Sequence, residues 1–408
     1  MKCRFCAHEL SHSFIDLAQS PPSNAYLKAE QLNEPETFFP LKVWVCETCF
    51  LVQIDEYKKS TDIFNDEYAY FSSYSSSWLA HSKRYTEGVI KRFGYNENSL
   101  VVEIASNDGY LLQYFKEKNI PVFGIEPTAN TAKVAIEKGV STIVDFFGER
   151  LAKQLVAEGK KADLLLGNNV LAHVPDINDF VRGLKIVLNT EGVITMEFPH
   201  LLNLIQQNQF DTIYHEHFSY LSFHLVKQVC ETHGLELFDV EALPTHGGSL
   251  RIFAKHKEDF TKKISLNVSN LLKKEAKAGL QNLSIYQTFQ AKADKVKDDF
   301  LLFLLKAKKQ NKTVVGYGAA AKGNTLLNYC GVKTDLVRFV VDASPHKQGK
   351  YLPGSHIPVV QESEIKALKP DYVVIFPWNI KSEIEQQLHY IRDWGGKFVV
   401  AVPRLRIF

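Results

Sequence analysis

The chain has 408 residues, of which 45% are hydrophobic and 23% are charged, and its formal net charge is +2. This balance is typical of a globular protein and argues against a disordered chain or a protein that coats nucleic acid. The length predicts two or three domains, because single cores stop growing near ~250 residues. No stretch reaches the ~18 consecutive apolar residues of a membrane span, and the first residues lack the apolar core of a signal peptide. We therefore expect a cytoplasmic protein that binds neither nucleic acid nor a membrane.

The cysteines fall into a pattern that is typical of a metal site. Four of the six form two Cys-x-x-Cys pairs, namely Cys3, Cys6, Cys46 and Cys49. Six cysteines are too few for a disulfide scaffold in a chain of this length, and a redox pair is expected at the start of a helix that follows a strand. Two such turns can complete a tetrahedral shell of four thiolates. The sequence predicts a structural Zn²⁺, with a closed shell that leaves no position for catalysis.

Residues 1–257 contain two regions that differ in their pattern of apolar residues. Residues 1–65 hold the cysteine pairs and only short apolar runs, so we expect a small zinc-binding domain there. Residues 66–257 alternate apolar runs with helix-length segments, as a parallel sheet buried on both faces requires. The expected strands are 100–106, 122–127, 141–147, 163–169, 193–199, 235–243 and 250–256. This pattern predicts a central α/β domain.

The remaining residues, 258–408, are expected to form a second α/β domain that follows a helical connector. Leucines at helical spacing among lysines predict two amphipathic helices, over 269–283 and 293–309. A second alternating series follows, with apolar runs at 313–320, 336–345, 371–378 and 397–403. The fold class is therefore α/β, with a zinc-binding domain and two domains of the Rossmann-like type.

A cofactor cleft is predicted where the central strands end. Residues 100–112 have the pattern of a strand, a tight loop and a helix, which offers backbone N–H groups to a carboxylate. Glu126 ends the next strand, where an acid can accept hydrogen bonds from both ribose hydroxyls. Asp145 ends the third strand and suits an adenine amino group, and the pair of asparagines at 168–169 ends the fourth. The spacing fits an adenosyl ligand laid across the strand ends.

At this cleft the chain resembles class I S-adenosylmethionine-dependent methyltransferases. The motifs that carry the resemblance are EIASNDGYLL (103–112), GIEPT (124–128), DFF (145–147) and GNNVLAHVPD (167–176). The first loop has fewer glycines than that class, and on spacing alone a dinucleotide enzyme stays possible, although Gly-x-Gly-x-x-Gly is missing. The candidate cofactor-binding residues are Glu103, Ala105, Asn107, Asp108, Gly109, Leu112, Glu126, Pro127, Asp145, Asn168, Asn169 and His173.

Residues 214–220, with the sequence YHEHFSY, bring an acid, two imidazoles and two phenols together. Methylation of carbon requires removal of a proton beside a carbonyl and stabilisation of the enolate, so a histidine base and phenolic donors suit that chemistry. His215 and His217 also invite a metal, but their spacing is not the i, i+4 spacing of a zincin helix. An aromatic loop with structural histidines is the other alternative.

The chain as a whole is similar to the nucleotide-sugar 3-C-methyltransferases, the family that acts on nucleoside-diphosphate 4-keto-deoxyhexoses. The resemblance rests on the cysteine pairs followed by FLVQ, on EIASNDGYLL, on YHEHFSYLS and on GYGAAAKGNTLL (316–327). It implies that Tyr214, Glu216 and His217 line the sugar site, with His217 as the proton-abstracting base. It also places a further tyrosine within residues 66–78, where Tyr68, Tyr70 and Tyr74 are all candidates and Tyr68 is preferred.

Substrate contacts are expected from two segments besides that cluster. Residues 315–325 have the pattern of a strand, a small-residue turn and a helix start with one lysine, which suits a diphosphate, although packing between helix and sheet explains small residues equally. The candidate substrate-binding residues are Tyr70, Tyr74, Gly316, Gly318, Lys322 and Asn324. Asp342 and the loop 246–249 are candidates of lower rank.

The sequence therefore predicts an enzyme that transfers a methyl group from S-adenosylmethionine to C3 of a nucleotide-linked 4-keto-deoxysugar. An S-adenosylmethionine-dependent O- or N-methyltransferase is the nearest alternative, because the cofactor cleft would be the same. An NAD-dependent sugar oxidoreductase would bind its cofactor near Gly316 and Gly318, and a zinc-ribbon interaction protein would bind nucleotide without chemistry. A monomer is favoured over an oligomer.

Overall fold

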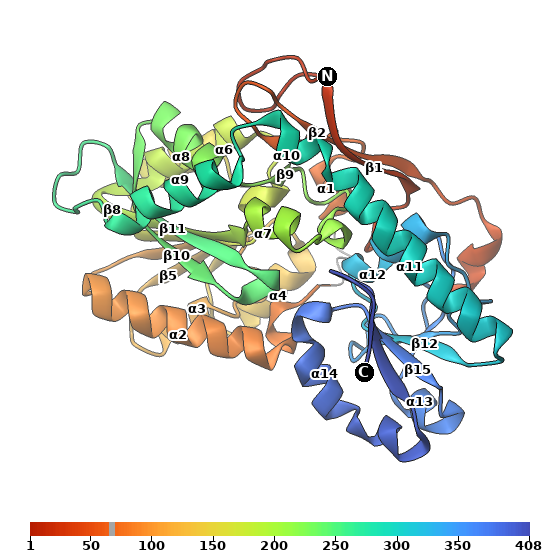
Figure 1. Cartoon of the computed structure of the whole chain (residues 1–408). Coiled ribbons are helices and arrows are strands. Elements are labelled where there is room, and N and C mark those ends of the chain that lie inside the picture. Colours follow the sequence, from red (N-terminus) through yellow and green to blue (C-terminus); the bar gives the residue numbers. More distant parts are fainter. Residues whose placement is uncertain (65–69) are drawn as a thin grey trace.

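A computed structural model describes residues 1–64 and 70–408 of the chain. These residues form three β-sheets with helices packed around them (Figure 1). Tyr68, the preferred tyrosine of residues 66–78, lies outside the described residues. Within them, none of the helices combines the length and hydrophobicity that crossing a bilayer requires.

The largest sheet has seven strands in the order β10-β11-β8-β7-β4-β5-β6. The strands are β4 (Val101–Ile104), β5 (Val122–Ile125), β6 (Thr142–Ile143), β7 (Ala162–Asn168), β8 (Leu188–Pro199), β10 (Leu235–Leu243) and β11 (Ser249–His256). All seven predicted strands are present, and β4 to β8 are parallel. The expected parallel order fails at β11, which runs antiparallel to both β8 and β10. The connection 244–248 is too short for a parallel crossover, so β10 and β11 form a hairpin.

Helices cover both faces of this central sheet, because neighbouring side chains on a strand point to opposite faces. Val101 and Leu164 pack toward α2 and α3, whereas Val102 and Leu165 pack toward α5, α6 and α8. Figure 1 shows α2 and α3 on one side of the sheet and α6 and α8 on the other. These helices are α2 (Ser76–Phe93), α3 (Leu112–Lys116), α4 (Ala129–Glu137), α5 (Glu149–Ala157), α6 (Ile177–Val187) and α8 (Phe223–Thr232).

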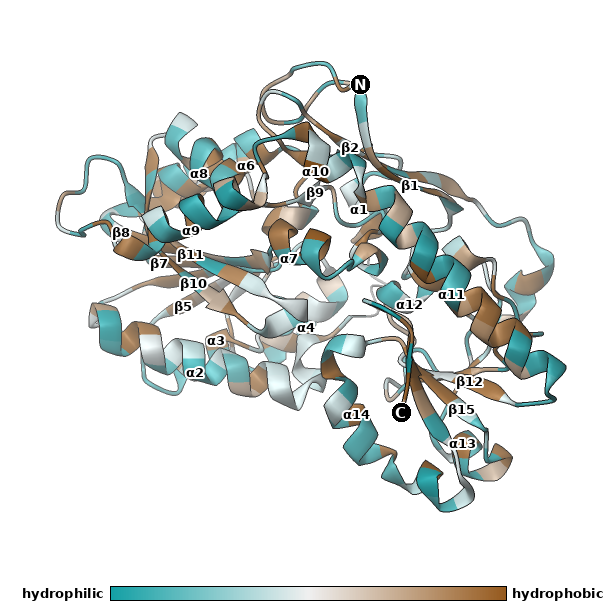
Figure 2. Cartoon of the chain, in the orientation of Figure 1, coloured by the Kyte–Doolittle hydropathy of each residue, from teal (hydrophilic) through white to brown (hydrophobic). Residues whose placement is uncertain are grey.

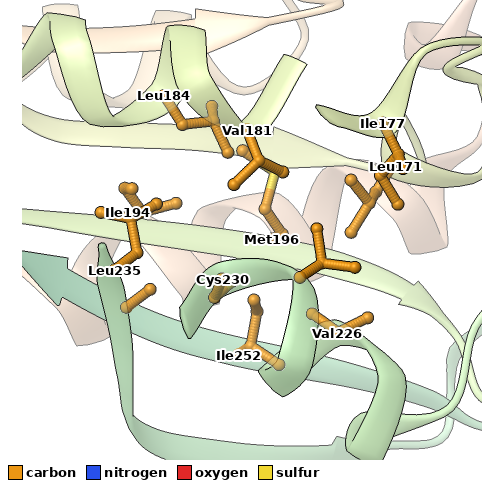
Figure 3. Close-up of a pocket in the computed structure, with 12 residues that line it drawn as sticks. Leu171, Ile177, Val181, Leu184, Ile194, Met196, Val226, Cys230, Leu235 and Ile252 are labelled. Atoms are coloured by element: carbon orange, nitrogen blue, oxygen red, sulfur yellow. The ribbon is translucent and has the colours of Figure 1, made fainter. Parts of the chain in front are cut away.

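A small void lies between the central sheet and the helices α6 and α8 (Figure 3). The labelled side chains that point into it are all hydrophobic and include Val181, Met196 and Ile252. Its volume of about 10 Å³ is at the lower limit for a single water molecule, and its lining offers no polar partner. The void is a feature of core packing and is not a ligand site.

The N-terminal region contributes a four-stranded sheet in the order β1-β2-β3-β9. Its strands are β1 (His12–Ser20), β2 (Phe39–Val45), β3 (Val52–Ile54) and β9 (Ser219–Tyr220). β9 comes from the segment YHEHFSY and pairs antiparallel with β3, Tyr220 opposite Val52. The candidate catalytic segment is therefore held at one end by the cysteine-bearing region.

The N-terminal region shares its hydrophobic core with the helical connector and the C-terminal region. The ring of Phe14 stacks on Phe289 with centroids 4.6 Å apart and meets Tyr286 edge-on at 5.9 Å. The connector consists of α9 (Leu266–Ala278), α10 (Leu283–Gln287) and α11 (Phe289–Lys309). α11 contains the predicted helix 293–309, whereas the helix predicted over 269–283 ends early, because Gly279 adopts a left-handed backbone and stops α9 at Ala278. Figure 2 shows hydrophobic and hydrophilic residues alternating along α11, as expected for a helix with one buried face. The small N-terminal region thus gains the core that it could not form alone.

The C-terminal sheet has six strands in the order β14-β13-β12-β15-β16-β17 and is parallel except for β17. The strands are β12 (Val314–Tyr317), β13 (Val340–Val341), β14 (Val359–Val360), β15 (Tyr372–Ile375), β16 (Lys397–Val400) and β17 (Arg406–Ile407). The sequence pattern predicted four of these and missed β14 and β17, which are too short to give a periodic signal. The remaining α-helices described are α1 (Ser60–Ile63), α7 (Leu201–Gln206), α12 (Ala321–Cys330), α13 (Ser363–Leu368) and α14 (Lys381–Gln387).

Candidate active site

The four N-terminal cysteines form a compact cluster whose geometry fits a zinc ion. Their sulfur atoms all lie within 4.8 Å of one another, and they are the one metal-binding group found among the described residues. Cys6 Sγ lies 3.6 Å from the sulfur atoms of Cys46 and Cys49, and Cys3 Sγ lies 3.6 Å from that of Cys49. A tetrahedral shell with Zn–S distances of about 2.3 Å has edges of roughly 3.8 Å, whereas a disulfide is about 2.05 Å long. The donors and spacings therefore suit zinc and exclude disulfides.

The loop between β4 and α3 forms the floor of the cofactor cleft. Ala105, Asn107 and Gly109 have positive φ angles of 57°, 48° and 75°. A side chain at Gly109 would bring its Cβ to 3.3 Å from the Cβ of Ala135 in α4, so this position combines a left-handed backbone with a close approach. The loop folds sharply back above the strand end, as the strand–loop–helix pattern predicted. Leu112, by contrast, is completely buried in the core next to α2.

Three acids surround this loop. Glu103 is fully buried, and neither carboxylate oxygen has a hydrogen-bond partner among the described residues. Burial raises the pKa of Glu103 well above its usual value. Glu126 Oε2 accepts a hydrogen bond from the backbone N–H of Asn107 at 2.8 Å, and Asp108 leaves Oδ1 without a partner. Unpaired buried acid atoms of this kind provide acceptors for the hydroxyl and ammonium groups of a ligand.

Asp145 and Pro127 lie at the outer end of the cleft. Asp145 forms an ion pair with Arg150 at 2.5 Å, so its carboxylate already has a charged partner. Pro127 follows Glu126 directly and is partly buried. Asp145 was expected to end the third strand, but β6 ends at Ile143, and Asp145 lies in the loop that follows.

The asparagines at the end of β7 face two different groups. Asn168 Nδ2 donates to the hydroxyl of Tyr110 at 3.4 Å, and Asn169 Nδ2 donates to Nε2 of His246 at 3.0 Å. Asn169 has a positive φ of 56° and leaves Oδ1 buried without a partner. His173 follows these asparagines in the chain. Burial lowers the pKa of His173 to about 4, so its imidazole is neutral.

The segment that includes Tyr70 and Tyr74 lies over the cofactor loop. Asn107 donates from Nδ2 to the carbonyl oxygen of Tyr70 at 3.1 Å and accepts at Oδ1 from the N–H of Ser72 at 2.9 Å. The hydroxyl of Tyr74 lies 3.2 Å from Nε2 of His346 in the C-terminal region. Both tyrosine side chains are largely exposed. This segment therefore bridges the cofactor loop and the C-terminal region.

His217 lies at the centre of the candidate catalytic cluster. Its Nδ1 is 2.8 Å from the carbonyl oxygen of Thr212. Its ring lies against Tyr214, with centroids 4.0 Å apart, and against His173 at 4.7 Å. Burial, together with the nearby His173, holds the pKa of His217 well below the usual histidine value. A neutral imidazole with a free Nε2 results, which is the form that a general base requires.

The two neighbours of His217 in the cluster have different surroundings. Glu216 is buried, accepts a hydrogen bond from Asn24 Nδ2 at 2.7 Å, and has its pKa raised by burial to about 7. His215 turns toward the N-terminal sheet, where Nε2 donates to the carbonyl oxygen of Pro40 at 3.2 Å. The rings of His215 and His217 contact different carbonyl oxygens, and the metal-binding group of three or more ligands found among the described residues is the cysteine cluster.

The glycine-rich segment at β12 and α12 brings one lysine toward this cluster. Lys322 lies over the ring of Trp378 at 4.6 Å and hydrogen-bonds to Asn379 at 2.9 Å, and burial lowers its pKa. Its charge acts on His217, whose pKa it lowers further. Asn324 is fully buried and donates to the carbonyl oxygen of Ser23, which ties α12 to the N-terminal region.

The two glycines of this segment are explained by close packing. A Cβ at Gly316 would lie 2.4 Å from the ring of Phe376, and one at Gly318 would lie 2.4 Å from Pro377. Gly318 also has a φ of 88°. Close packing between helix and sheet therefore explains why glycine occupies both positions.

The sequence pattern missed a buried charged cluster behind the cleft. Glu197 at the end of β8 is fully buried and accepts hydrogen bonds from Arg251 at 2.7 Å and from Thr245 at 2.7 Å, and it pairs with His81 at 2.8 Å. Burial opposes ionisation of Glu197, but His81 and Arg251 outweigh it and keep the carboxyl pKa below its usual value. A charged residue within each of two apolar runs was the signal that could have revealed this cluster.

These features define a methyltransferase-type α/β protein that carries a four-cysteine zinc site. Family models match residues 3–64 ("Putative zinc binding domain"), 78–240 ("Methyltransferase domain") and 244–403 ("C-methyltransferase C-terminal domain"). The curated "C-methyltransferase NovU" of Streptomyces niveus is 32% identical over 406 residues, covering 100% of this chain and 96% of that protein. The chain therefore belongs to the family of S-adenosylmethionine-dependent C-methyltransferases. This membership decides against the oxidoreductase, the interaction protein and the oxygen or nitrogen acceptor.

Solved structures also align with part of the chain. Magnesium protoporphyrin IX methyltransferase of Synechocystis PCC 6803, solved with bound SAH, covers 43% of this chain and 84% of its own, at 14% identity and a TM-score of 0.35. The PH0226 protein of Pyrococcus horikoshii OT3 covers 50% of this chain and 100% of its own, at 15% identity and a TM-score of 0.38.

The residues at the cleft fit S-adenosylmethionine, and the cysteines fit zinc. Buried polar atoms without a hydrogen-bond partner among residues 1–64 and 70–408 lie near the strand ends: both oxygens of Glu103, Oδ1 of Asp108, Oδ1 of Asn169 and Nδ1 of His173. The cofactor carries an ammonium group, ribose hydroxyls and an adenine amino group that such atoms can bind. When bound, it supplies an electrophilic methyl group. The zinc site has a closed shell of thiolates, which is typical of a structural role.

Proposed function

We propose that this enzyme methylates C3 of a nucleotide-linked 4-keto-deoxysugar, and that His217 removes the proton from that carbon. The observation that carries the proposal is the hydrogen bond from His217 Nδ1 to the carbonyl oxygen of Thr212. A carbonyl only accepts, so Nδ1 carries the proton and Nε2 keeps its lone pair for a proton from the substrate. A hydrogen on carbon beside a ketone is acidic enough for such a base, whereas other sugar C–H bonds are not.

The surroundings of His217 support the formation of an enolate. Burial raises the pKa of the Tyr214 hydroxyl well above its usual value, so the phenol remains a hydrogen-bond donor. Glu216, with a pKa of about 7, can exchange a proton near neutral pH. Tyr214 and Glu216 are therefore proposed to line the sugar site, and Tyr68 to approach it from the segment outside the described residues.

The nucleotide half of the substrate is proposed to bind against the C-terminal region. Lys322 and Lys347 provide positive charge there, and Lys347 Nζ donates to the carbonyl oxygen of Ala319 at 2.8 Å. The side chains of Tyr70 and Tyr74 are partly exposed, and the Tyr74 hydroxyl lies next to His346 of the C-terminal region. A diphosphate needs this combination of cations and exposed donors. We also propose domain boundaries at 65/66 and 257/258, and a monomeric enzyme.

Solvent deuterium exchange tests the proposal directly. A nucleotide-linked 4-keto-6-deoxyhexose is incubated in D₂O with the wild-type enzyme without S-adenosylmethionine, and loss of the C3 proton signal is followed by NMR. We expect exchange by wild type and a loss of about 10²–10⁴-fold in His217→Ala. The exposed His389→Ala is the matched control and should exchange at the wild-type rate. Absence of exchange and of methyl transfer with every such sugar would overturn the proposed substrate.

A further inference from the structure

The loop between β10 and β11 has an unusual backbone. His246, Gly247 and Gly248 have successive φ angles of 53°, 89° and 113°. The two glycines adopt such angles freely, but a histidine in the left-handed region carries a conformational cost. Residues held in this way persist only where the surrounding structure fixes them, and they cluster at functional sites.

Contacts from several elements fix this loop. The hydroxyl of Thr245 donates to Glu197 at 2.7 Å, and the carbonyl oxygen of Gly247 accepts from Gln209 Nε2 at 2.7 Å. A Cβ at Gly247 would lie 2.5 Å from the ring of Trp378, which belongs to the C-terminal region. The loop is therefore held between the central sheet and the C-terminal region, and it cannot relax without disturbing both.

The buried charged cluster stabilises the anchor of this loop. Glu197 is bound on one side by His81 and Arg251 and on the other by Thr245. The Arg251 side chain is only 7% exposed and that of Glu197 is not exposed at all. A carboxylate so fully paired holds its partners in one arrangement. These contacts hold Thr245, the residue before His246, in a fixed position.

The loop of His246 and the backbone that holds His217 both contact Trp378: a Cβ at Gly247 would lie 2.5 Å from its ring, and its Nε1 donates to Asp211, next to Thr212. Asn169 Nδ2 donates to His246 Nε2, so the ring proton is on Nδ1, and the structure gives Nδ1 no partner among the described residues. The ring meets Trp78 edge-on, with centroids 5.1 Å apart. Burial, and then the charge of Lys322, lower the pKa of His246 to about 4. Burial lowers the pKa of His217, and His173 and His246 add to this effect.

The two histidines have complementary hydrogen-bonding states. His217 has its Nδ1 proton occupied by a carbonyl and leaves Nε2 as an acceptor, whereas His246 has Nε2 occupied by an amide and leaves an Nδ1–H donor. Conversion of a ketone to an enolate needs an acceptor for the proton and a donor for the oxygen, and these two histidines provide one of each.

We propose that His246 is a further catalytic residue, whose Nδ1–H donates a hydrogen bond to the substrate carbonyl oxygen as that oxygen becomes an enolate. This inference rests on the proposed function. The C–H bond breaks and its proton goes to Nε2 of His217, while the electron pair forms the carbon–carbon double bond and the carbonyl π pair moves to oxygen. His246 acts as a hydrogen-bond donor and not as an acid: it keeps its own proton throughout and stabilises the negative charge on oxygen.

Two substitutions at position 246 separate this role from a structural one. His246→Gly removes the imidazole at a position where glycine adopts the backbone without strain, so the loop is expected to keep its fold. His246→Asn keeps an amide N–H close to the position of Nδ1, and asparagine tolerates a left-handed backbone. His389→Ala is again the control. The readouts are the rate of C3 deuterium exchange, kcat and KM for methyl transfer, and calorimetric affinity for S-adenosylmethionine.

We expect His246→Gly to lose about 10²–10³-fold in exchange and in kcat, as removal of one oxyanion donor does, with unchanged cofactor affinity. His246→Asn should recover at least about tenfold of that loss. If His246→Gly exchanges and turns over as wild type does, or if asparagine recovers nothing, the inference is wrong and the proposed function still stands. If wild type itself exchanges no 4-keto-sugar, the proposed function is wrong and the role of His246 is overturned with it.

Discussion

Nδ1 of His217 lies 2.8 Å from the carbonyl oxygen of Thr212, and this contact fixes which nitrogen of the imidazole carries the proton. The preceding residue, Asp211, is held in turn by a hydrogen bond from Trp378 of the C-terminal region at 2.7 Å. Thr325 of α12 donates to the carbonyl oxygen of Ile213 at 2.8 Å. The backbone that orients the proposed base is therefore fixed from the C-terminal side.

The pH dependence of methyl transfer should reflect this environment. Burial lowers the pKa of His217 well below the usual histidine value of 6.5, so the base stays unprotonated in mildly acidic solution. Glu216, whose pKa is about 7, also titrates in this site, so we expect the acid limb of kcat/KM to lie below pH 6.5 in a Glu216→Gln variant, in which His217 sets the limb. The measurement is a kcat/KM profile at saturating S-adenosylmethionine. An acid limb at or above pH 6.5 in this variant would show that the essential base is not a desolvated histidine.

Removal of the charge of Lys322 should change both substrate binding and the acid limb. Lys322→Met loses a charge-assisted contact worth about 1.5–3 kcal/mol, so KM for the nucleotide sugar should rise roughly 10–100-fold. Because the Lys322 cation lowers the pKa of His217, its loss should move the acid limb to higher pH. Lys366→Met is the matched control, since Lys366 lies over Tyr390 at the same 4.6 Å on an exposed face. Equal kinetics for the two variants would refute a substrate role for Lys322.

Loss of the zinc site should unfold more than the N-terminal region, because the four-stranded sheet includes β9 next to His217. Cys6→Ser should abolish stoichiometric zinc, measured by plasma mass spectrometry. A metal loss of this kind costs on the order of 4–5 kcal/mol, which lowers Tm by roughly 8–20 °C. Cys230→Ala, in a buried thiol away from the cluster, should keep its zinc. A zinc-free Cys6→Ser protein with wild-type Tm and activity would contradict this account.

The pair formed by Arg251 and Glu197 should be costly to break. Arg251→Met leaves a fully buried carboxylate without its strongest partner, and breaking such pairs costs about 3–5 kcal/mol. The exposed pair of Arg182 and Glu149, with N–O distance 2.7 Å, provides the control Arg182→Met, for which thermal unfolding should change little. Similar Tm values for the two variants would mean that water or rearrangement compensates the buried charge.

Much of the fold follows from local patterns in the sequence. The strands β4, which contains Glu103, and β5, which precedes Glu126, were predicted because a buried parallel strand has a continuous apolar run and because the turn after it needs special residues. The cysteine cluster followed from spacing alone. Each of these signals is contained in a short stretch of the sequence.

The parts that the sequence could not predict depend on contacts between distant segments. Nothing in the pattern around Tyr220 indicates that it pairs with Val52, and the antiparallel β11 follows only from the short connection before it. The opposite orientations of His215 and His217 depend on which carbonyl oxygen each ring meets. The approach of Lys322 to the catalytic cluster is likewise a result of packing between regions.

The most direct test of the central claim is to locate the transferred methyl group. The enzyme is incubated with a nucleotide-linked 4-keto-6-deoxyhexose and S-adenosylmethionine labelled with ¹³C in its methyl group, and the product is examined by two-dimensional NMR. We expect a labelled methyl bonded to C3, with long-range correlations to the neighbouring ring carbons, and no labelled product in the His217→Ala reaction. A label bonded to oxygen or nitrogen, or a C-methylated product formed equally well by His217→Ala, would contradict it.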